Sequence, residues 1–490
     1  MRKFAPIAVF VFALLCGGCA THTSRTQEMR GYWRVGEAQK AYAQASELGG
    51  ESGESGDADE LVWLLEEGAT ARAAGGFAES NKAFGKAFDK ISDYENQPEI
   101  SVLRESEAFL TNQSYLSYKG YNYDKIMLCT YTALNCIQTK DFDRAAVELK
   151  RLENFQREAK LKNIDKIAKS EKALAQANRE RGADGYNVSK TVSNPNVQAA
   201  LRRVYGDGYA GGSTAAGNFI NPFGYWLGGI FFASRPADSA DRERAATLMR
   251  LCYESLGGKS QILAEDLAAA EKLADSPNAG FGNITYVVLE TGCAPIRRQV
   301  RIDLPIFIVA KHVPYVAVNF PYLEPQKSFK QSVPISADGR EVRFDTIADF
   351  DSIIGEEFNA QLPYVVAKTV LSAAAKATAQ YFAARAAGDD WGLAVQIAGG
   401  IYQAMMNDAD LRTWTTLPKQ IRLARLETPA SGKITVGGKT VDLSPKGVNI
   451  VYVKSMSASG IDSVRVFDFR DAPEKAVSGG AEKQKAAESK

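Results

Sequence analysis

The pattern of apolar and polar positions divides this 490-residue chain into a helical first half and a strand-rich second half. The clearest helical period lies at residues 61–91, where a turn at Gly75-Gly76-Phe77 separates two predicted helices. The facing positions of the two helices are Leu64, Gly68, Ser80, Phe84 and Ala87. Spacings of three and four residues are typical of amphipathic helices, so this segment predicts a helical hairpin.

A second hairpin is predicted around the Asp141-Phe142 turn. Its apolar positions are Cys129, Ala133, Cys136, Phe142, Ala145, Leu149 and Leu152. Both units resemble the tetratricopeptide repeat, a helical hairpin of about 34 residues. In that pattern a small residue such as Gly68 admits the second helix, and an aromatic residue after the turn, here Phe77 or Phe142, closes the hairpin. These aromatics are 65 residues apart, so a degenerate repeat or an ordered loop at 112–123 would intervene. A helical hairpin without repeat ancestry is the alternative.

Further helices are predicted on both sides of these hairpins. A third unit begins at Asn221-Pro222-Phe223, because Asn favours the cap and Pro the first helical position. Its faces would carry Tyr225, Trp226, Gly228 and Phe232, then Ala245, Met249 and Cys252. Other helices are expected at 33–48 and 155–179. Residues 49–56, rich in Gly and Glu, predict either a flexible linker or a surface loop.

After Pro277 the pattern changes to short runs rich in β-forming residues. Strands are predicted at 284–289, 300–304, 315–320, 420–425, 433–436, 441–443, 449–454 and 464–469. Helices are predicted at 346–357, 363–387 and 393–406, the last two packing as a pair or, alternatively, inserting into a membrane. The predicted fold class is mainly α with a C-terminal α+β part: TPR-like helical hairpins followed by a mixed β/helix module.

The first twenty residues resemble a bacterial lipoprotein signal. Arg2 and Lys3 precede an apolar run at residues 7–15, which is too short to span a bilayer but suits a signal peptide. Gly17-Gly18-Cys19 then matches the end of a lipobox, although Cys16 stands where Leu is usual. We therefore predict lipidation at Cys19; an ordinary signal that leaves Cys19 as a free thiol is the alternative. Because Ala20 is not Asp, the expected location is the periplasmic side of the outer membrane.

These patterns divide the chain into five parts. They are a signal peptide (1–18), a tether with one helix (19–60), a TPR-like domain (61–276), an α+β module (277–471) and a disordered tail (472–490). The apolar stretches at 208–234 and 365–387 are diluted by glycines or interrupted by charges, so neither is predicted to span the membrane.

Composition narrows the possible partners. Lys and Arg number 59 and Asp and Glu 58, and this balance gives no reason to expect nucleic-acid binding. The body of the chain carries Cys129, Cys136, Cys252 and Cys293. Seven residues along one helix separate the first two by about 10.5 Å, beyond disulfide reach. No zinc-type spacing occurs, and His22 and His312 are the two histidines, so no metal or cofactor is predicted.

Several motifs of the sequence contain residue types that could carry chemistry. The GxGxxG at residues 206–211 follows a predicted helix rather than a strand, so we interpret it as a loop. The carboxylate pairs Asp349/Asp351 and Asp408/Asp410 would suit a glycan-acting enzyme only across a cleft. Arg412 and Trp414 are interpreted as a structural clamp, with Arg412 on helix C-terminal carbonyls and Trp414 between modules; a partner-binding hot spot is the alternative.

Taken together, these segments resemble a family of uncharacterised bacterial outer-membrane lipoproteins with tetratricopeptide-like repeats. The matching pieces are the lipobox, the repeat at 131–153, Asn221-Pro222-Phe223, the strand at 297–305 and the segment 410–418. The resemblance implies an architecture and no activity. The expected function is a non-catalytic scaffold that binds a protein or peptide; a subunit of an envelope assembly or secretion complex and a glycan-acting enzyme are the alternatives.

Overall fold

The computed structural model describes residues 22–55, 58–96, 117–181, 188–206, 220–276, 279–305, 315–337, 342–386 and 409–471. The N-terminal helices are α2 (His22–Arg25), α3 (Gln27–Arg34), α4 (Ala38–Ser55), α5 (Glu60–Ala74), α6 (Phe77–Asn96), α8 (Asn122–Gln138) and α9 (Phe142–Arg181). They are followed by α10 (Val188–Val192), α11 (Pro195–Tyr205), α12 (Pro222–Ser234), α13 (Ser239–Ser255), α14 (Gln261–Asp275) and later α15 (Phe350–Ala386). The strands are β1 (Ile284–Thr291), β2 (Ile296–Pro305), β3 (Tyr315–Glu324), β4 (Ile335–Ser336), β5 (Asp345–Asp349), β6 (Gln420–Glu427), β7 (Lys433–Val436), β8 (Lys439–Asp442), β9 (Val448–Ser455) and β10 (Ser463–Asp468). This arrangement confirms the predicted class, mainly α with a C-terminal α+β part.

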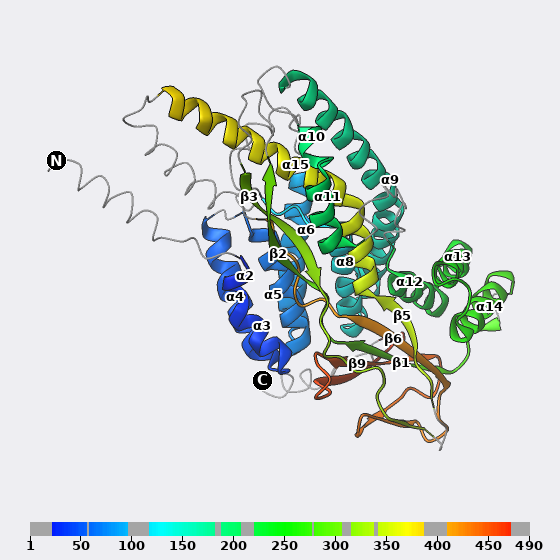
Figure 1. The fold of residues 1–490 in the computed structure, drawn as a ribbon. Coiled ribbons are helices and arrows are strands. Elements are labelled where there is room, and N and C mark those ends of the chain that lie inside the picture. Colours follow the sequence, from blue (N-terminus) through cyan, green and yellow to red (C-terminus); the bar gives the residue numbers. More distant parts are fainter. Residues whose placement is uncertain are drawn as a thin grey trace, which may run out of the picture.

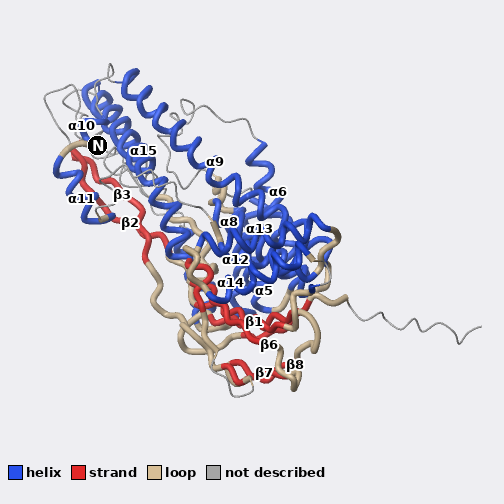
Figure 2. Tube along the Cα trace, turned by 90° about the vertical axis from the view of Figure 1, so that its right-hand side faces the viewer, coloured by secondary structure: helices blue, strands red, loops and turns tan. Residues whose placement is uncertain are grey.

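A five-stranded sheet lies between two layers. Its strand order is β10-β9-β1-β6-β5, with β1 and β9 parallel and the other pairs antiparallel. Helices cover one face, and the small sheet β4-β7-β8 covers the other (Figures 1 and 2). Every residue of β1 and β9 is buried, because successive side chains enter opposite layers. In β1, Tyr286 and Val288 join the helical core, whereas Val287 and Leu289 face the small sheet.

The hairpin β2–β3 forms a separate apolar cluster with α11 and α15. Figure 2 shows this hairpin running alongside α15, away from the five-stranded sheet. Among the helices that the structure describes, none combines the length and apolarity needed to cross a membrane.

The first predicted hairpin is observed as α5 and α6. A Cβ atom on Gly68 would lie 2.1 Å from Cε1 of Phe84, so glycine is what permits the close approach of the two helices. Phe84 and Ala87 are fully buried, and Phe77, at the start of α6, is half-buried beneath the guanidinium of Arg465. Gly75 ends α5 in the left-handed conformation, as the predicted turn requires.

The second and third hairpins also have the expected buried faces. Phe142, Ala145 and Leu149 are buried on α9, and Cys129 and Cys136 are buried, free thiols on the single helix α8. Asn221 caps α12 by accepting a hydrogen bond from the amide of Phe223. Cys252 and Cys293 are likewise buried and free.

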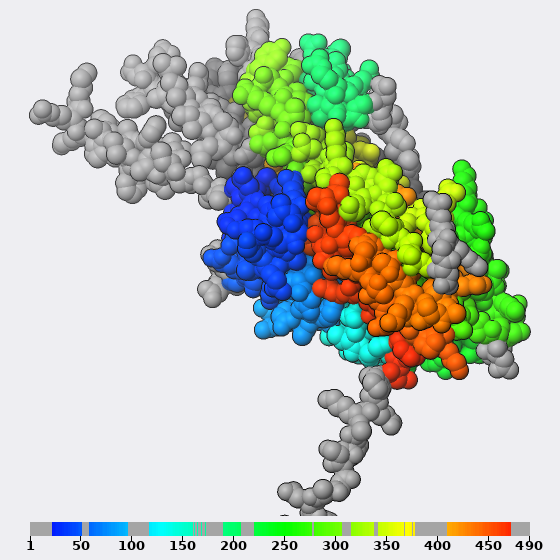
Figure 3. All heavy atoms as spheres, turned by 90° about the horizontal axis from the view of Figure 1, so that it is seen from below, coloured from blue at the N-terminus to red at the C-terminus, as the bar shows by residue number. Residues whose placement is uncertain are grey.

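The N-terminal segment differs from the predicted tether. The expected helix at 33–48 is two helices, α3 and α4, because the chain turns at Gly36 with φ +80°. Residues 49–55, expected as a linker or loop, continue α4. Met29 and Trp33 of α3 are buried against Cys293 and Met456, so this segment packs on the body; Figure 3 shows it against the C-terminal strands.

Three other predictions of element bounds were wrong. Residues 346–349 form part of β5 rather than a helix, because they pair with β6. The helices predicted at 346–357 and 363–387 are the one helix α15, which continues through Pro363. The helix predicted at 155–179 is the C-terminal part of α9, which begins at Phe142.

The segments on either side of the predicted boundary at residue 277 share one apolar core. Trp226 of α12 and Tyr131 of α8 join Tyr286 of β1 and Leu423 of β6 in a single cluster. Each segment therefore buries its apolar face against the other. Cys19, the glycine-rich residues 207–219, the helix predicted at 393–406 and the tail from 472 lie outside the described residues.

Candidate binding cleft at the edge of the central sheet

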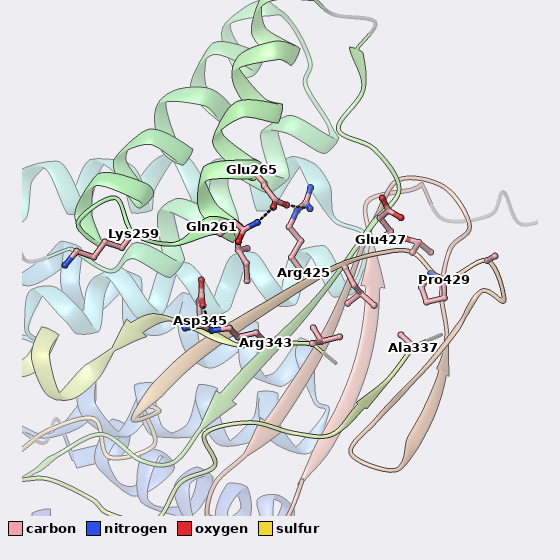
Figure 4. A pocket seen from close by; sticks show the side chains of 14 residues that line it. Lys259, Gln261, Glu265, Ala337, Arg343, Asp345, Arg425, Glu427 and Pro429 are labelled. Atoms are coloured by element: carbon pink, nitrogen blue, oxygen red, sulfur yellow. Dashed lines mark hydrogen bonds and ion pairs between the residues drawn. The ribbon is translucent and has the colours of Figure 1, made fainter. Parts of the chain in front are cut away.

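A cleft of about 680 Å³ lies where α14 passes over the outer edge of the five-stranded sheet (Figure 4). This volume is within the range of about 300–1,000 Å³ that is usual for ligand sites. The cleft is lined by Lys259, Gln261, Ile262, Glu265, Ala337, Val342, Arg343, Asp345, Arg425, Leu426, Glu427, Thr428, Pro429 and Ala430. These residues come from the start of α14, the segments before β5 and after β4, and the end of β6.

The position of α14 over the sheet is fixed at its N-terminus. Ser260 caps the helix, since its hydroxyl accepts a hydrogen bond from the amide of Leu263 at 3.3 Å. The same hydroxyl donates to Asp345 of β5 at 2.6 Å. One side chain therefore both starts α14 and fastens it to the edge strand of the sheet.

The inner wall of the cleft is an ion-pair network centred on Arg425. Its guanidinium contacts Glu265 at 2.6 Å and the fully buried Asp266 at 3.0 Å. Asp266 also accepts hydrogen bonds from Trp226 and Tyr286. Burial raises the pKa of Asp266 to about 6, although these donors act in the opposite direction. The network joins β6 to α14 and keeps this wall rigid.

The described lining of the cleft carries balanced charge. Three basic residues (Lys259, Arg343 and Arg425) stand with three acidic ones (Glu265, Asp345 and Glu427). Glu265 is paired with Arg425, and Asp345 accepts from Ser260. Within the described part of the chain, no group of three His, Cys, Asp or Glu side chains is arranged to hold a metal ion. This lining suits recognition of a polar, mixed-charge ligand.

None of these lining residues was among the predicted site residues. The cleft depends on β5 being shorter than β6, and the sequence pattern assigned the residues of β5 to a helix. Ser260 before an apolar helical period is a capping signal, but it marks a helix start and gives no indication of a cleft.

The predicted clamp residues lie in the protein interior. Trp414 is fully buried, with its ring 6.1 Å from that of Phe84 on α6 and 5.8 Å from that of Tyr131 on α8. Arg412 binds Asp410 at 2.7 Å and Asp59 at 3.1 Å, and it also donates to the carbonyl of Ala58. Asp59 and Ala58 directly precede α5, so Arg412 lies at the N-terminal end of that helix rather than on C-terminal carbonyls.

Glu66, a buried residue of α5 that the sequence pattern did not single out, holds the same segment. Its carboxylate accepts the backbone amides of Thr415 and Thr416 at 2.5 and 3.2 Å. It also accepts their hydroxyls at 2.7 and 2.5 Å. Four donors thus offset part of the cost of burying this carboxylate, although burial still raises the pKa of Glu66. The sequence signal that could have identified Glu66 is the position of a charged residue within the apolar face of a predicted helix.

The described carboxylates that the sequence offers as candidates for a glycan-acting enzyme form contacts with neighbouring side chains. Asp349 accepts from Gln420 at 2.7 Å, Asp351 pairs with Lys419, and Asp410 pairs with Arg412. Asp408 lies outside the described residues. None of the three described carboxylates lines the cleft.

Asp124 gives the fold a predicted dependence on pH. Burial raises the pKa of Asp124 to about 7 from 3.8, although hydrogen bonds from Tyr118 and the Tyr121 amide act in the opposite direction. The native state then holds a proton that the unfolded chain releases, so this residue lowers stability as the pH rises from about 4 to about 7. We expect Asp124→Asn to gain stability relative to the wild type over that interval, by about 1.4 kcal/mol per pKa unit at most.

Urea unfolding at a series of pH values measures this difference, with the exposed Asp143→Asn as the control. A constant difference between Asp124→Asn and the wild type from pH 4 to 8 would contradict the assignment.

No protein-family model, curated protein or solved structure matches this chain.

Proposed function

We propose that this protein is a lipid-anchored, non-catalytic binding protein of the cell envelope, and that the cleft beside α14 is the site of its protein partner. The observation that carries the proposal is the cleft itself: a volume of about 680 Å³ at an exposed sheet edge, lined by charges of both signs. Its acidic residues are engaged by Arg425 or Ser260 or stand at the rim, which supports binding over glycan chemistry.

The packing of the repeat helices supports placing the partner in this cleft. In α5 the residues from Leu61 to Arg72 are buried on all sides except at Glu67, and α8 is buried from Tyr123 to Ile137 except at Lys125. A binding surface on these helices would need faces that already contact other helices and the sheet. The outer side of α6, which includes the exposed Lys82, is one surface of the repeat helices that stays accessible.

The N-terminal helices support a body held close to the membrane. His22 follows Cys19 by three residues, which span at most about 11 Å when extended. His22 is buried, and its ring centroid lies 4.7 Å from that of Trp63. Burial and the nearby Arg412 lower the pKa of His22 to about 3, so it stays neutral. With lipid on Cys19, the short connection from Cys19 to the buried His22 would hold the body of the protein at the surface of the outer membrane.

Site-specific photocrosslinking in intact envelopes tests the partner site. A photoreactive side chain at Glu427, on the rim of the cleft, should give a covalent adduct with one discrete protein. The same side chain at the exposed Glu243 of α13 is the control and should give none. Adducts from Lys82 on α6 with none from Glu427 would move the partner to the repeat surface, and no adduct at either position would contradict a binding function.

Mass spectrometry of the mature N-terminus tests the anchor separately. The N-terminal peptide should begin at Cys19 and carry a thioether-linked diacylglycerol, and Cys19→Ala should lose this mass. Detection of an unmodified Cys19, or of cleavage at another residue, would refute the anchor without affecting the cleft.

A further inference from the structure

Within the described residues, the outer edge of β6 is unpaired over half of its length. β6 pairs with β1 from Gln420 to Glu427, but on the other side β5 pairs with it only as far as Leu423. Among the residues that the structure describes, none forms a strand beside 424–427 on that side. Among the described residues, no backbone hydrogen bond joins the segment 342–344 to this part of β6.

The register shows which backbone groups face the opening. The amide of Thr428 donates to the carbonyl of Asn283 at 2.9 Å, so the even-numbered residues of β6 bond toward β1. Along an antiparallel strand these groups alternate in direction. The N–H and C=O groups of Arg425 and Glu427 consequently point away from β1, into the cleft.

The chemistry of this edge selects the kind of occupant. Its donors and acceptors repeat every two residues, about 7 Å, over a length of about 13 Å. Another polypeptide backbone has the same repeat, whereas a sugar or a small anion does not. The walls, formed by Gln261, Ile262 and Glu265 on one side and Ala337 and Val342 on the other, leave a channel for alternate side chains.

Charge at the two ends of the cleft gives the occupant a direction. Figure 4 places Lys259 and Glu427 at opposite ends. Both side chains are exposed, and neither has an ion pair or a side-chain hydrogen bond within the described part of the chain. A strand in line with β5 would run antiparallel to β6, with its N-terminal end near Glu427 and its C-terminal end near Lys259.

We propose that the cleft takes an extended segment of a partner protein as an additional strand on the open edge of β6. The segment runs antiparallel to β6 and carries a basic side chain near its N-terminal end and an acidic one near its C-terminal end. This inference rests on the proposed function and names the form in which the partner binds. A second copy of this chain, or its own residues 338–341, would be the competing occupants.

The test uses the full mature chain and random decapeptides displayed on phage, followed by the tightest-binding decapeptide as a synthetic probe. Glu427→Pro removes one outward N–H and leaves the bonds to β1 in place. We expect it to weaken binding of the decapeptide by about ten-fold or more, whereas Glu427→Ala, which keeps the N–H, weakens it less than three-fold. The decapeptide methylated at alternate backbone nitrogens should not bind. Failure to select any peptide, or equal binding to Glu427→Pro and Glu427→Ala, would overturn the proposal.

Amide hydrogen exchange on the unaltered chain gives a second readout that does not depend on how the proline variant folds. The decapeptide should slow exchange at Arg425 and Glu427 and leave Leu426, which already bonds to β1, unchanged. Protection of Arg425 and Glu427 without peptide would show that the edge is already filled by this chain or a second copy, and would overturn the proposal. If Glu427 photocrosslinks a partner but these amides do not respond to the peptide, the proposed function stands and strand addition fails.

Discussion

Replacing Glu66 with alanine is expected to lower the free energy of unfolding by about 3–5 kcal/mol. The substitution leaves the amides and hydroxyls of Thr415 and Thr416 without their acceptor, in a place where Thr416 is fully buried and Thr415 nearly so. A buried donor that loses its partner costs about 1–3 kcal/mol. Because Trp414 precedes these threonines, the loss should also loosen the packing between α6 and α8.

Urea unfolding followed by far-UV circular dichroism measures this effect, with tryptophan fluorescence reporting the surroundings of Trp414. Glu66→Gln keeps one acceptor oxygen and should lose less stability than Glu66→Ala. The exposed Glu243→Ala on α13 should change stability by less than about 0.5 kcal/mol. If Glu66→Ala unfolds at the same urea concentration as Glu243→Ala, the carboxylate does not hold the segment.

Replacing Gly68 or Gly85 of the first hairpin with alanine should change the stability of the protein in opposite directions. Gly68→Ala places a methyl group 2.1 Å from Cε1 of the buried Phe84 and should cost about 1–3 kcal/mol. Gly85→Ala on α6 has nothing within 4 Å of the new methyl group, so it should gain about 0.5–1 kcal/mol from reduced backbone entropy in the unfolded chain.

Thermal unfolding of the two variants and of a double variant measures this contrast. Phe84→Leu should remove part of the clash, so Gly68→Ala should cost less in the Phe84→Leu background than in the wild type. Equal effects of Gly68→Ala and Gly85→Ala would mean that the approach of α5 and α6 does not depend on glycine.

Local sequence rules predict some elements of this fold and not others. The pairing of Gly68 with Phe84 and the Asn221–Pro222 helix start were predictable, because small-to-large packing and capping are local rules. The strand β5 was missed, since residues 346–349 are followed directly by helical residues and acquire their strand conformation by pairing with β6. The continuation of α15 through Pro363 is likewise not a local preference.

The conformation of the N-terminal segment is also not predicted by local preferences alone. Gly49 and Gly50 favour a flexible chain, but the helix α4 continues through them because Ala41 and Ala45 are buried beside α3 and α4 packs along α5. A Cβ atom added at Gly49 would lie 3.1 Å from Oε2 of Glu67 on α5, which shows how closely the two helices approach there. Tertiary packing therefore overrides the intrinsic preference of the two glycines.

The sequence alone was sufficient to predict the helical hairpins, most of the strands, and the apolar helix faces that carry the buried Cys129, Cys136 and Cys252. It also makes Cys19 the predicted lipid site, which stays a prediction. All of these follow from local spacing and local chemistry. The tertiary structure decided that Glu66 holds Thr415 and Thr416, and that Arg425 joins α14 to β6. It also decided that β6 extends past β5 and opens a cleft. These features join residues up to about 350 positions apart, and only the packing of helices on the sheet brings them together.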